Sequence, residues 1–128
     1  MSMTLYDFMF EESSTLGRPW FVDAATGRTI SGLAVKARTD ALALGLSGTL
    51  GLGGFTSTRD AHRECGIRDV VAVVSPNTVD FGVVVWAAHK LGCTVASIGG
   101  GSTADELKHQ FLLTGTWTIF VSEKSSPD

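Results

Sequence analysis

Residues 69–99 read DVVAVVSPNTVDFGVVVWAAHKLGCTVASIG, and two apolar runs in this stretch decide the fold. The first run, DVVAVVS, is continuous and is stopped by Pro76. The second run, CTVASIG, begins at Cys93. Continuous apolar runs of this length are typical of parallel strands that are covered on both faces. We therefore predict two buried, parallel strands at these positions.

The segment between the two runs has the propensity of a strand, because Val83–Val85 are all β-branched. Its ends favour a helix instead. Asn77 is a good helix cap, and Gly92 follows two cationic residues as a stop signal. These signals predict a helix that starts at Asn77 and ends before Gly92.

A capping box and a glycine frame a second helix further along the chain. Thr103 and Glu106 have the spacing of the box, and Gly115 ends the helix. WTIFVSE, from Trp117, is a third apolar strand. The order is β-α-β-α-β, and right-handed crossovers then require a parallel sheet with flanking helices. The fold class is α/β, and we expect residues 1–128 to form a single, partial domain.

An N-terminal β-hairpin and a helix precede the sheet. PWFVDAATGRTIS, from Pro19, reads as strand, turn and strand, with the turn at Thr26-Gly27. Ser31 caps the helix that follows, and its polar residues Lys36, Arg38 and Asp40 lie off the apolar face. The spacing predicts that this buried face consists of Leu33, Ala37, Ala41 and Leu44.

The flanks of this helix carry weaker patterns. Residues 1–18 show no clear period, although Phe8–Phe10 are candidates to dock on the core. The helix fades near Gly48, and the stretch from Gly48 to Gly66 is rich in glycine and threonine, which predicts a long loop.

Composition excludes several classes of protein. With 44% apolar and 18% charged residues, a globular chain is favoured over a disordered one. The net charge of −3 argues against nucleic-acid binding, and the apolar runs are too short to span a bilayer. Two cysteines make no disulfide framework, so we expect a cytoplasmic, intracellular location.

The turn before the second helix is the candidate cofactor-binding segment. It consists of Gly99, Gly100, Gly101, Ser102 and Thr103. Glycines between a strand and a helix often cradle a phosphate, because the first N–H groups of the helix have no internal partner. The alternative is a plain turn.

Four groups of residues share their order with a known family. They are Ser75-Pro76-Asn77, Lys90-Leu91-Gly92, Thr103-Ala104-Asp105-Glu106-Leu107 and Thr114-Gly115-Thr116, preceded by the hairpin FVDAATGRTIS. In this order they resemble the N-terminal part of the adenylate-forming (AMP-binding) ligases, which include acyl- and aryl-CoA synthetases, 4-coumarate–CoA ligase and firefly-type luciferases. The glycines at 99–101 and Ser102 depart from the family, which has N-P-x-Y at this place.

The resemblance implies a chemistry that needs more than these residues. In the family a carboxylate attacks the α-phosphate of ATP, and CoA then displaces AMP, so ATP, Mg²⁺ and CoA are the implied cofactors. The family binds ATP on a later Ser/Thr/Gly-rich loop ending in Pro-Lys, and its catalytic Lys belongs to a separate C-terminal domain. Neither motif occurs in the 128 residues. We therefore expect no catalytic residue and no bound cofactor in this chain, and no activity of the chain alone. By the resemblance, the turn at Gly99–Gly101 is a connection.

Other possible sites have simpler explanations. His62 with Cys65 and His89 with Cys93 supply the ligand types of zinc, but a strand and a helix separate the pairs, so we expect no metal. The three tryptophans are expected in the core or at a subdomain contact. Asp105 and Glu106 are explained by the dipole of the helix that they begin.

The helix after Asn77 is apolar on nearly all sides, which predicts that it is buried all round. A chain this short lacks part of that cover. We therefore expect an exposed apolar patch, and either a homo-oligomer or contact with the remainder of a ligase domain. Two alternatives stay open: a stand-alone, non-catalytic interaction module, and a small nucleotide-binding domain that uses the turn at Gly99–Gly101.

Overall fold

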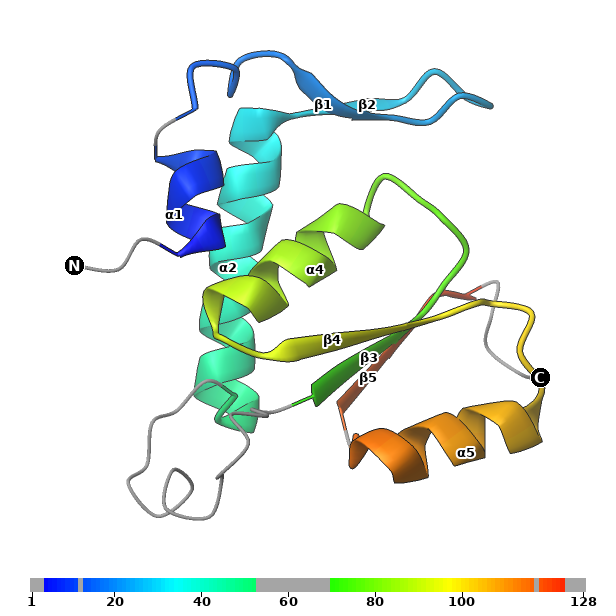
Figure 1. Ribbon diagram of the computed structural model, residues 1–128. Helices are drawn as coiled ribbons and strands as arrows, with labels where there is room; N and C mark the ends of the chain where they lie inside the picture. Colours follow the sequence, from blue (N-terminus) through cyan, green and yellow to red (C-terminus); the bar gives the residue numbers. More distant parts are fainter. Residues whose placement is uncertain (1–3, 12, 53–69, 117, 124–128) are drawn as a thin grey trace.

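The computed structural model describes residues 4–11, 13–52, 70–116 and 118–123. Its centre is a three-stranded parallel sheet in the order β4-β3-β5 (Figure 1). The strands are β3 (Val70–Val74), β4 (Thr94–Ile98) and β5 (Thr118–Val121). The predicted parallel α/β sheet is therefore confirmed, with Val71 paired to Val95 on one side and to Thr118 on the other.

The most apolar strand takes the central position. All five residues of β3 are buried, whereas β4 exposes Thr94 and Ser97 at one edge of the sheet. This arrangement follows from the sequence, because a strand with neighbours on both sides and cover on both faces must lack polar side chains.

Helix α4 (Phe81–Lys90) joins β3 to β4, so the predicted helix is confirmed, but its predicted start is wrong. Asn77 does not cap it. The chain first makes a turn in which the Phe81 N–H donates to the Thr78 carbonyl, and Asp80 occupies the cap position without a side-chain capping bond. The Asp80 carboxylate binds two arginines instead, as described below. Gly92, with φ of 72°, follows the helix as predicted.

Helix α5 (Ala104–Thr114) joins β4 to β5 and lies on the opposite side of the sheet from α4 (Figure 1). Its predicted capping box is present. The Thr103 Oγ1 accepts from the Glu106 N–H, the Glu106 carboxylate accepts from the Thr103 N–H, and Gly115 ends the helix with φ of 64°. No residue of α5 is buried. The predicted role of Glu106 at the helix start is confirmed.

The predicted hairpin is confirmed as β1 (Pro19–Val22) and β2 (Thr29–Ser31), which pair antiparallel. Gly27 turns the chain with φ of 75°. A short helix that the sequence analysis missed precedes the hairpin. This helix, α1 (Leu5–Phe10), carries its own capping box between Thr4 and Asp7, which is a local signal that could have revealed it.

Helix α2 (Gly32–Leu50) is capped by Ser31 as predicted and runs slightly past Gly48, to Gly51 with φ of 63°. Its predicted buried face is wrong. Leu33, Ala37, Ala41 and Leu44 are all exposed, and the buried residues are Gly32, Val35, Thr39, Ala43 and Leu46. Two sets of apolar residues in this helix have helical spacing, one on each of two faces. Polar Thr39 interrupts the face that is buried, so the sequence pattern favours the other, uninterrupted face.

Two clusters of apolar side chains hold these elements together. One joins the second half of α2 to α4, β3 and Cys93, through residues such as Leu46, Val71 and Ala87. The other joins α1 and the hairpin to the first halves of α2 and α4. The core therefore continues from the sheet, across α4, to the N-terminal helix.

The expected exposed apolar side chains are present, but they lie elsewhere than at α4. In α4 Gly82, Val83, Ala87 and Ala88 are buried. Among the described residues the exposed large apolar side chains include Leu33 and Leu44 of α2, Leu112 and Leu113 of α5, and Ile119 and Val121 of β5. The predicted loop from Gly48 to Gly66 lies outside the described residues from position 53 onward.

Candidate functional site at the carboxyl ends of the strands

A hollow of about 790 Å³ lies outside the carboxyl ends of β3 and β5. Four segments form it: the hairpin tip, the turn after β3, the start of α4 and the end of β5. Apolar lining comes from Val73, Phe81 and Phe120, and polar lining includes Asp23 and Glu123. This is the part of an open parallel sheet where ligands bind most often.

An ion pair network fixes one wall of the hollow. Both Nη atoms of Arg28 donate to the Asp80 carboxylate, at 3.1 and 3.2 Å, and the Arg38 Nη1 donates at 2.8 Å. The hairpin, α2 and the start of α4 meet at this carboxylate. The hydrogen bonds from Arg28 and then Arg38 hold the pKa of Asp80 below its ordinary value, so both guanidinium groups are engaged near neutral pH.

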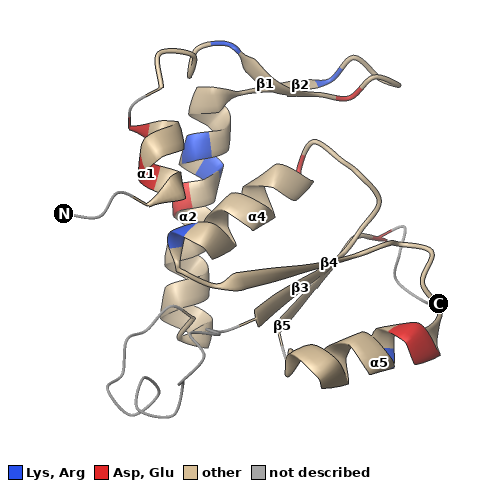
Figure 2. Cartoon of the chain, in the orientation of Figure 1, with Lys and Arg blue, Asp and Glu red and all other residues tan. Residues whose placement is uncertain are grey.

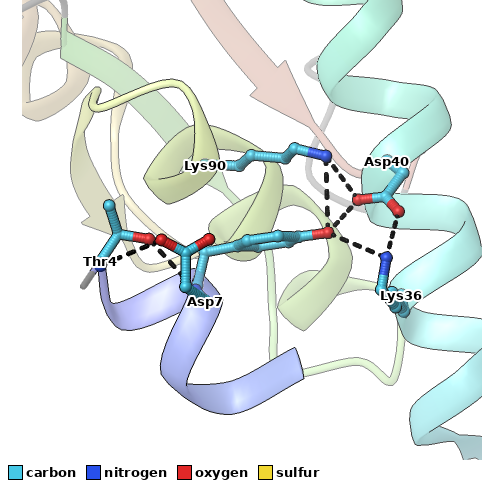
Figure 3. Close-up of polar contacts among 6 residues, drawn as sticks. Thr4, Asp7, Lys36, Asp40 and Lys90 are labelled. Atoms are coloured by element: carbon cyan, nitrogen blue, oxygen red, sulfur yellow. Dashed lines mark hydrogen bonds and ion pairs between the residues drawn. The ribbon is translucent and has the colours of Figure 1, made fainter. Parts of the chain in front are cut away.

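A second polar cluster lies where α1, α2 and α4 come together (Figure 2). Asp40 binds the Lys36 Nζ and the Lys90 Nζ, each at 2.7 Å (Figure 3). The Tyr6 hydroxyl donates to the same carboxylate, and each Nζ lies 3.5 Å from that hydroxyl oxygen. The Lys90 Nζ also lies 4.7 Å from the centre of the Tyr6 ring. One carboxylate therefore ties three helices together.

For Lys36 and Asp40 the sequence predicted only that they lie off the apolar face of their helix. Their i,i+4 spacing is a local signal that could have revealed this pair, but Tyr6 and Lys90 are brought to them by tertiary packing. Burial raises the pKa of the Asp40 carboxyl, and the hydrogen bonds from Lys36, Lys90 and Tyr6 outweigh this and hold the pKa well below its usual range. The bond to Asp40 also raises the pKa of both lysines.

This cluster predicts acid-sensitive stability. The folded-state pKa of Asp40 is lowered, so its contribution is complete above the unfolded value of about 4 and is lost as pH falls toward the folded value. Asp40→Asn is expected to lower the free energy of unfolding by about 1 kcal/mol at pH 7, since the pair is partly exposed to solvent. The difference from the parent chain should shrink steadily when urea unfolding is repeated down to about pH 3.

Asp105→Asn is the matched control, because Asp105 is exposed at the start of α5 and makes no contact with the cluster. It should change stability by less than about 0.5 kcal/mol. If Asp40→Asn lowered the free energy of unfolding by the same amount at pH 7 and at about pH 3, the side chain would contribute packing and not charge.

The candidate turn from Gly99 to Thr103 joins β4 to α5. The hollow lies at the ends of the other two strands, β3 and β5. A Cβ at Gly99 or Gly101 would meet no atom within 4 Å. The Ser102 N–H donates to the Gly99 carbonyl, and Thr103 and Glu106 bond each other. Three N–H groups that a phosphate would need are engaged, and binding at this turn stays a prediction.

Two of the four residues with zinc-ligand side chains, His89 and Cys93, lie within the described residues. His89 packs edge-on against Trp86, with ring centroids 5.9 Å apart, and Cys93 is buried in the core. His62 and Cys65 lie outside the described residues, as does Trp117. In the described part of the chain no group of three or more His, Cys, Asp or Glu side chains could hold a metal ion.

The residues of the hollow do not fit a nucleotide triphosphate. Its described lining carries the carboxylates of Asp23, Asp80 and Glu123 and contains no Lys or Arg. Arg28 and Arg38 are already paired with the Asp80 carboxylate. Negative phosphate oxygens would therefore meet the like charges of Asp23 and Glu123 at close range.

Two ligases are similar in sequence to most of this chain. The chain is 33% identical to the acyl-CoA ligase AFT1-1 of Alternaria alternata over 125 residues, which cover 93% of this chain and 20% of the relative. It is 38% identical to 4-coumarate–CoA ligase-like 6 of Oryza sativa subsp. japonica over 104 residues, covering 81% of this chain and 15% of the relative. The chain matches one part of the adenylate-forming ligases. No protein-family model matches it.

Solved structures show the same adenylate-forming ligase fold. The luciferase-like enzyme of the mealworm Zophobas morio superposes with a TM-score of 0.76 at 25% identity, over 97% of this chain and 27% of that one. MatB of Rhodopseudomonas palustris superposes with a TM-score of 0.69 at 19% identity, over 93% and 21%. The chain thus spans between 15% and 27% of the length of the four proteins named. In its described part, no helix is long and apolar enough to cross a membrane.

Proposed function

We propose that this chain forms the first layer of the large domain of an ATP-dependent acyl- or aryl-CoA ligase-like protein, and that it has no ligase activity by itself. The observation that carries the proposal is the match of nearly the whole chain to a fifth of an acyl-CoA ligase, at 33% identity. The poor fit of the hollow to phosphates supports the second half of the proposal, because the reaction must neutralise a triphosphate.

Exposed leucines also support the proposal that this chain is one layer of a larger domain. Leu44 of α2 and Leu112 and Leu113 of α5 are each between 69% and 75% exposed. Large apolar side chains at this exposure are costly in water when they gather, and they mark surfaces that another part of a protein covers. They lie on helices on both sides of the sheet, so cover is needed on two faces.

The test is a turnover assay on the purified chain. With ATP, Mg²⁺, CoA and 4-coumarate or a fatty acid, we expect neither thioester nor pyrophosphate above the level of a boiled sample. An active 4-coumarate–CoA ligase, assayed alongside, shows that the conditions support the reaction, and the circular dichroism of the chain shows that it is folded. Thioester formation by the folded chain would overturn the proposal.

The same leucines favour a second candidate, a non-catalytic interaction module. Gel filtration with light scattering separates it from the third candidate, a small nucleotide-binding domain. A stable dimer, or a complex with a ligase, would support the module. Heat released in calorimetry with ATP, AMP or CoA would support the nucleotide-binding domain.

A further inference from the structure

The hollow lies at the point where the direction of the sheet's connections reverses. The chain leaves β3 through α4 to reach β4 on one side, and returns through α5 to β5 on the other side. The two helices consequently cover opposite faces (Figure 1). Between the carboxyl ends of β3 and β5 neither helix closes the sheet, and this crevice is where ligands bind in open parallel sheets.

The size and floor of the hollow suit a small molecule. Its volume of about 790 Å³ falls within the range of roughly 300–1,000 Å³ that is usual for ligand sites. Val73 of β3, Phe81 and Val84 of α4 and Phe120 of β5 supply the apolar part of the lining. Two phenyl rings among them favour a planar or aromatic group.

The rim selects for positive charge. Asp23 from the hairpin and Glu123 from the end of β5 both line the hollow. The Asp23 carboxylate accepts bonds from the N–H groups of Ala25 and Thr26, which fix it at the tip of the hairpin. The hydrogen bond from the Ala25 N–H and then the one from the Thr26 side chain lower the pKa of Asp23, so its carboxylate is ionised at neutral pH. The third carboxylate, Asp80, is neutralised by Arg28 and Arg38.

We propose that the hollow between β3 and β5 binds a small aromatic amine, with the ring against the phenyl groups and the ammonium at Asp23 and Glu123. The apolar floor and the acidic rim carry this inference together, and it does not rest on the proposed function. The Arg28–Asp80–Arg38 network holds the hairpin tip over the start of α4, so the rim is set before a ligand arrives. A carboxylate or phosphate in place of the ammonium would meet like charge.

Nuclear magnetic resonance of the ¹⁵N-labelled chain tests this proposal with two probes. Tyramine carries a phenol ring and an ammonium, and phloretic acid carries the same ring with a carboxylate in its place. We expect tyramine to shift the amide signals of Val73, Phe81 and Phe120 in a saturable manner. Phloretic acid should bind at least about tenfold more weakly, since one attractive charge contact becomes repulsive.

Glu123→Gln should weaken tyramine binding about three- to tenfold, because one charge contact is removed from an exposed rim. Glu123 is exposed, so the variant is expected to fold, and its spectrum reports this directly. Asp105→Asn makes the same change of charge at the start of α5 and should leave binding unchanged. Equal affinity for the two probes, shifts confined to other parts of the chain, or full binding by Glu123→Gln would each overturn the proposal.

Discussion

Phe10→Ala is expected to lower the free energy of unfolding by about 3–5 kcal/mol, which is the usual loss when a large buried aromatic side chain is truncated. Phe10 is 1% exposed and belongs to the apolar cluster that joins α1 to α2 and α4. Its ring centroid lies 4.8 Å from that of Tyr6, 5.1 Å from that of Trp20 and 5.3 Å from that of Trp86. Truncation would leave a cavity between three aromatic rings.

Phe8→Ala is the matched control for this prediction. Phe8 belongs to the same helix and is the same type of residue, but it is 58% exposed. Its truncation removes much less buried surface than that of Phe10, so the loss should be no more than about 1 kcal/mol. Urea unfolding of both variants, followed by tryptophan fluorescence, measures the difference. Equal effects of the two substitutions would mean that α1 is not packed on the core as described.

Gly32→Ala is expected to destabilise the chain by about 1–3 kcal/mol, the usual cost of forcing an extra group into packed surroundings. A Cβ at position 32 would lie 2.6 Å from the Trp20 Cε2 and 2.8 Å from the Leu16 Cα. The second contact is with backbone. It cannot move aside cheaply, because the Leu16 carbonyl accepts from the Leu33 N–H at 2.7 Å and the Arg18 carbonyl accepts from the Gly32 N–H at 3.0 Å.

Gly45→Ala provides the opposite result within the same helix. Gly45 is exposed, and no atom lies within 4 Å of a Cβ built there. Alanine is the better helix former by up to about 1 kcal/mol, so this variant should be more stable than the parent chain. The two substitutions are chemically identical, and thermal unfolding should move the melting temperature in opposite directions. A gain in stability from Gly32→Ala would show that Trp20 and Leu16 do not close over the start of α2.

Two carboxylates, Asp40 and Asp80, join the helices and the hairpin that carry these contacts. Asp40 receives bonds from Tyr6 of α1 and Lys90 of α4, and Asp80 receives bonds from Arg28 of the hairpin and Arg38 of α2. Each carboxylate thus joins segments that are distant in sequence. Because both sites are partly exposed, we expect them to set the relative position of the helices more than to supply stability.

Much of the sheet could be predicted from short stretches of sequence. The continuous runs at β3 and β4 predicted parallel, covered strands, and the capping box at Thr103 with Gly115 set both ends of α5. The start of α4 was missed because Asn77 is a good cap in isolation, whereas the chain there makes a turn before Asp80. Local signals of this kind act over a few residues, so they predict that an element exists better than where it begins.

The candidate site could be predicted only in part. The acidic and aromatic residues of the hollow are far apart in the sequence, from Asp23 to Glu123, and no motif joins them. The glycine turn at Gly99–Gly101, which stood out in the sequence, belongs to β4 and α5 instead. A site of this type depends on the order of the strands in the sheet, and short sequence patterns do not predict that order.

The amino-acid sequence by itself determined which segments become strands and helices, because apolar periodicity and caps act within a few residues of the chain. The tertiary structure alone decided that α2 buries Val35, Ala43 and Leu46 and leaves Leu33 and Leu44 in solvent. The helix offers two apolar faces, and burial goes to the one that α4 and the N-terminal helix can reach. The same packing brings Tyr6, Asp40 and Lys90 together. Contacts between segments that are distant in the sequence depend on how all the elements pack, so no single stretch of sequence predicts them.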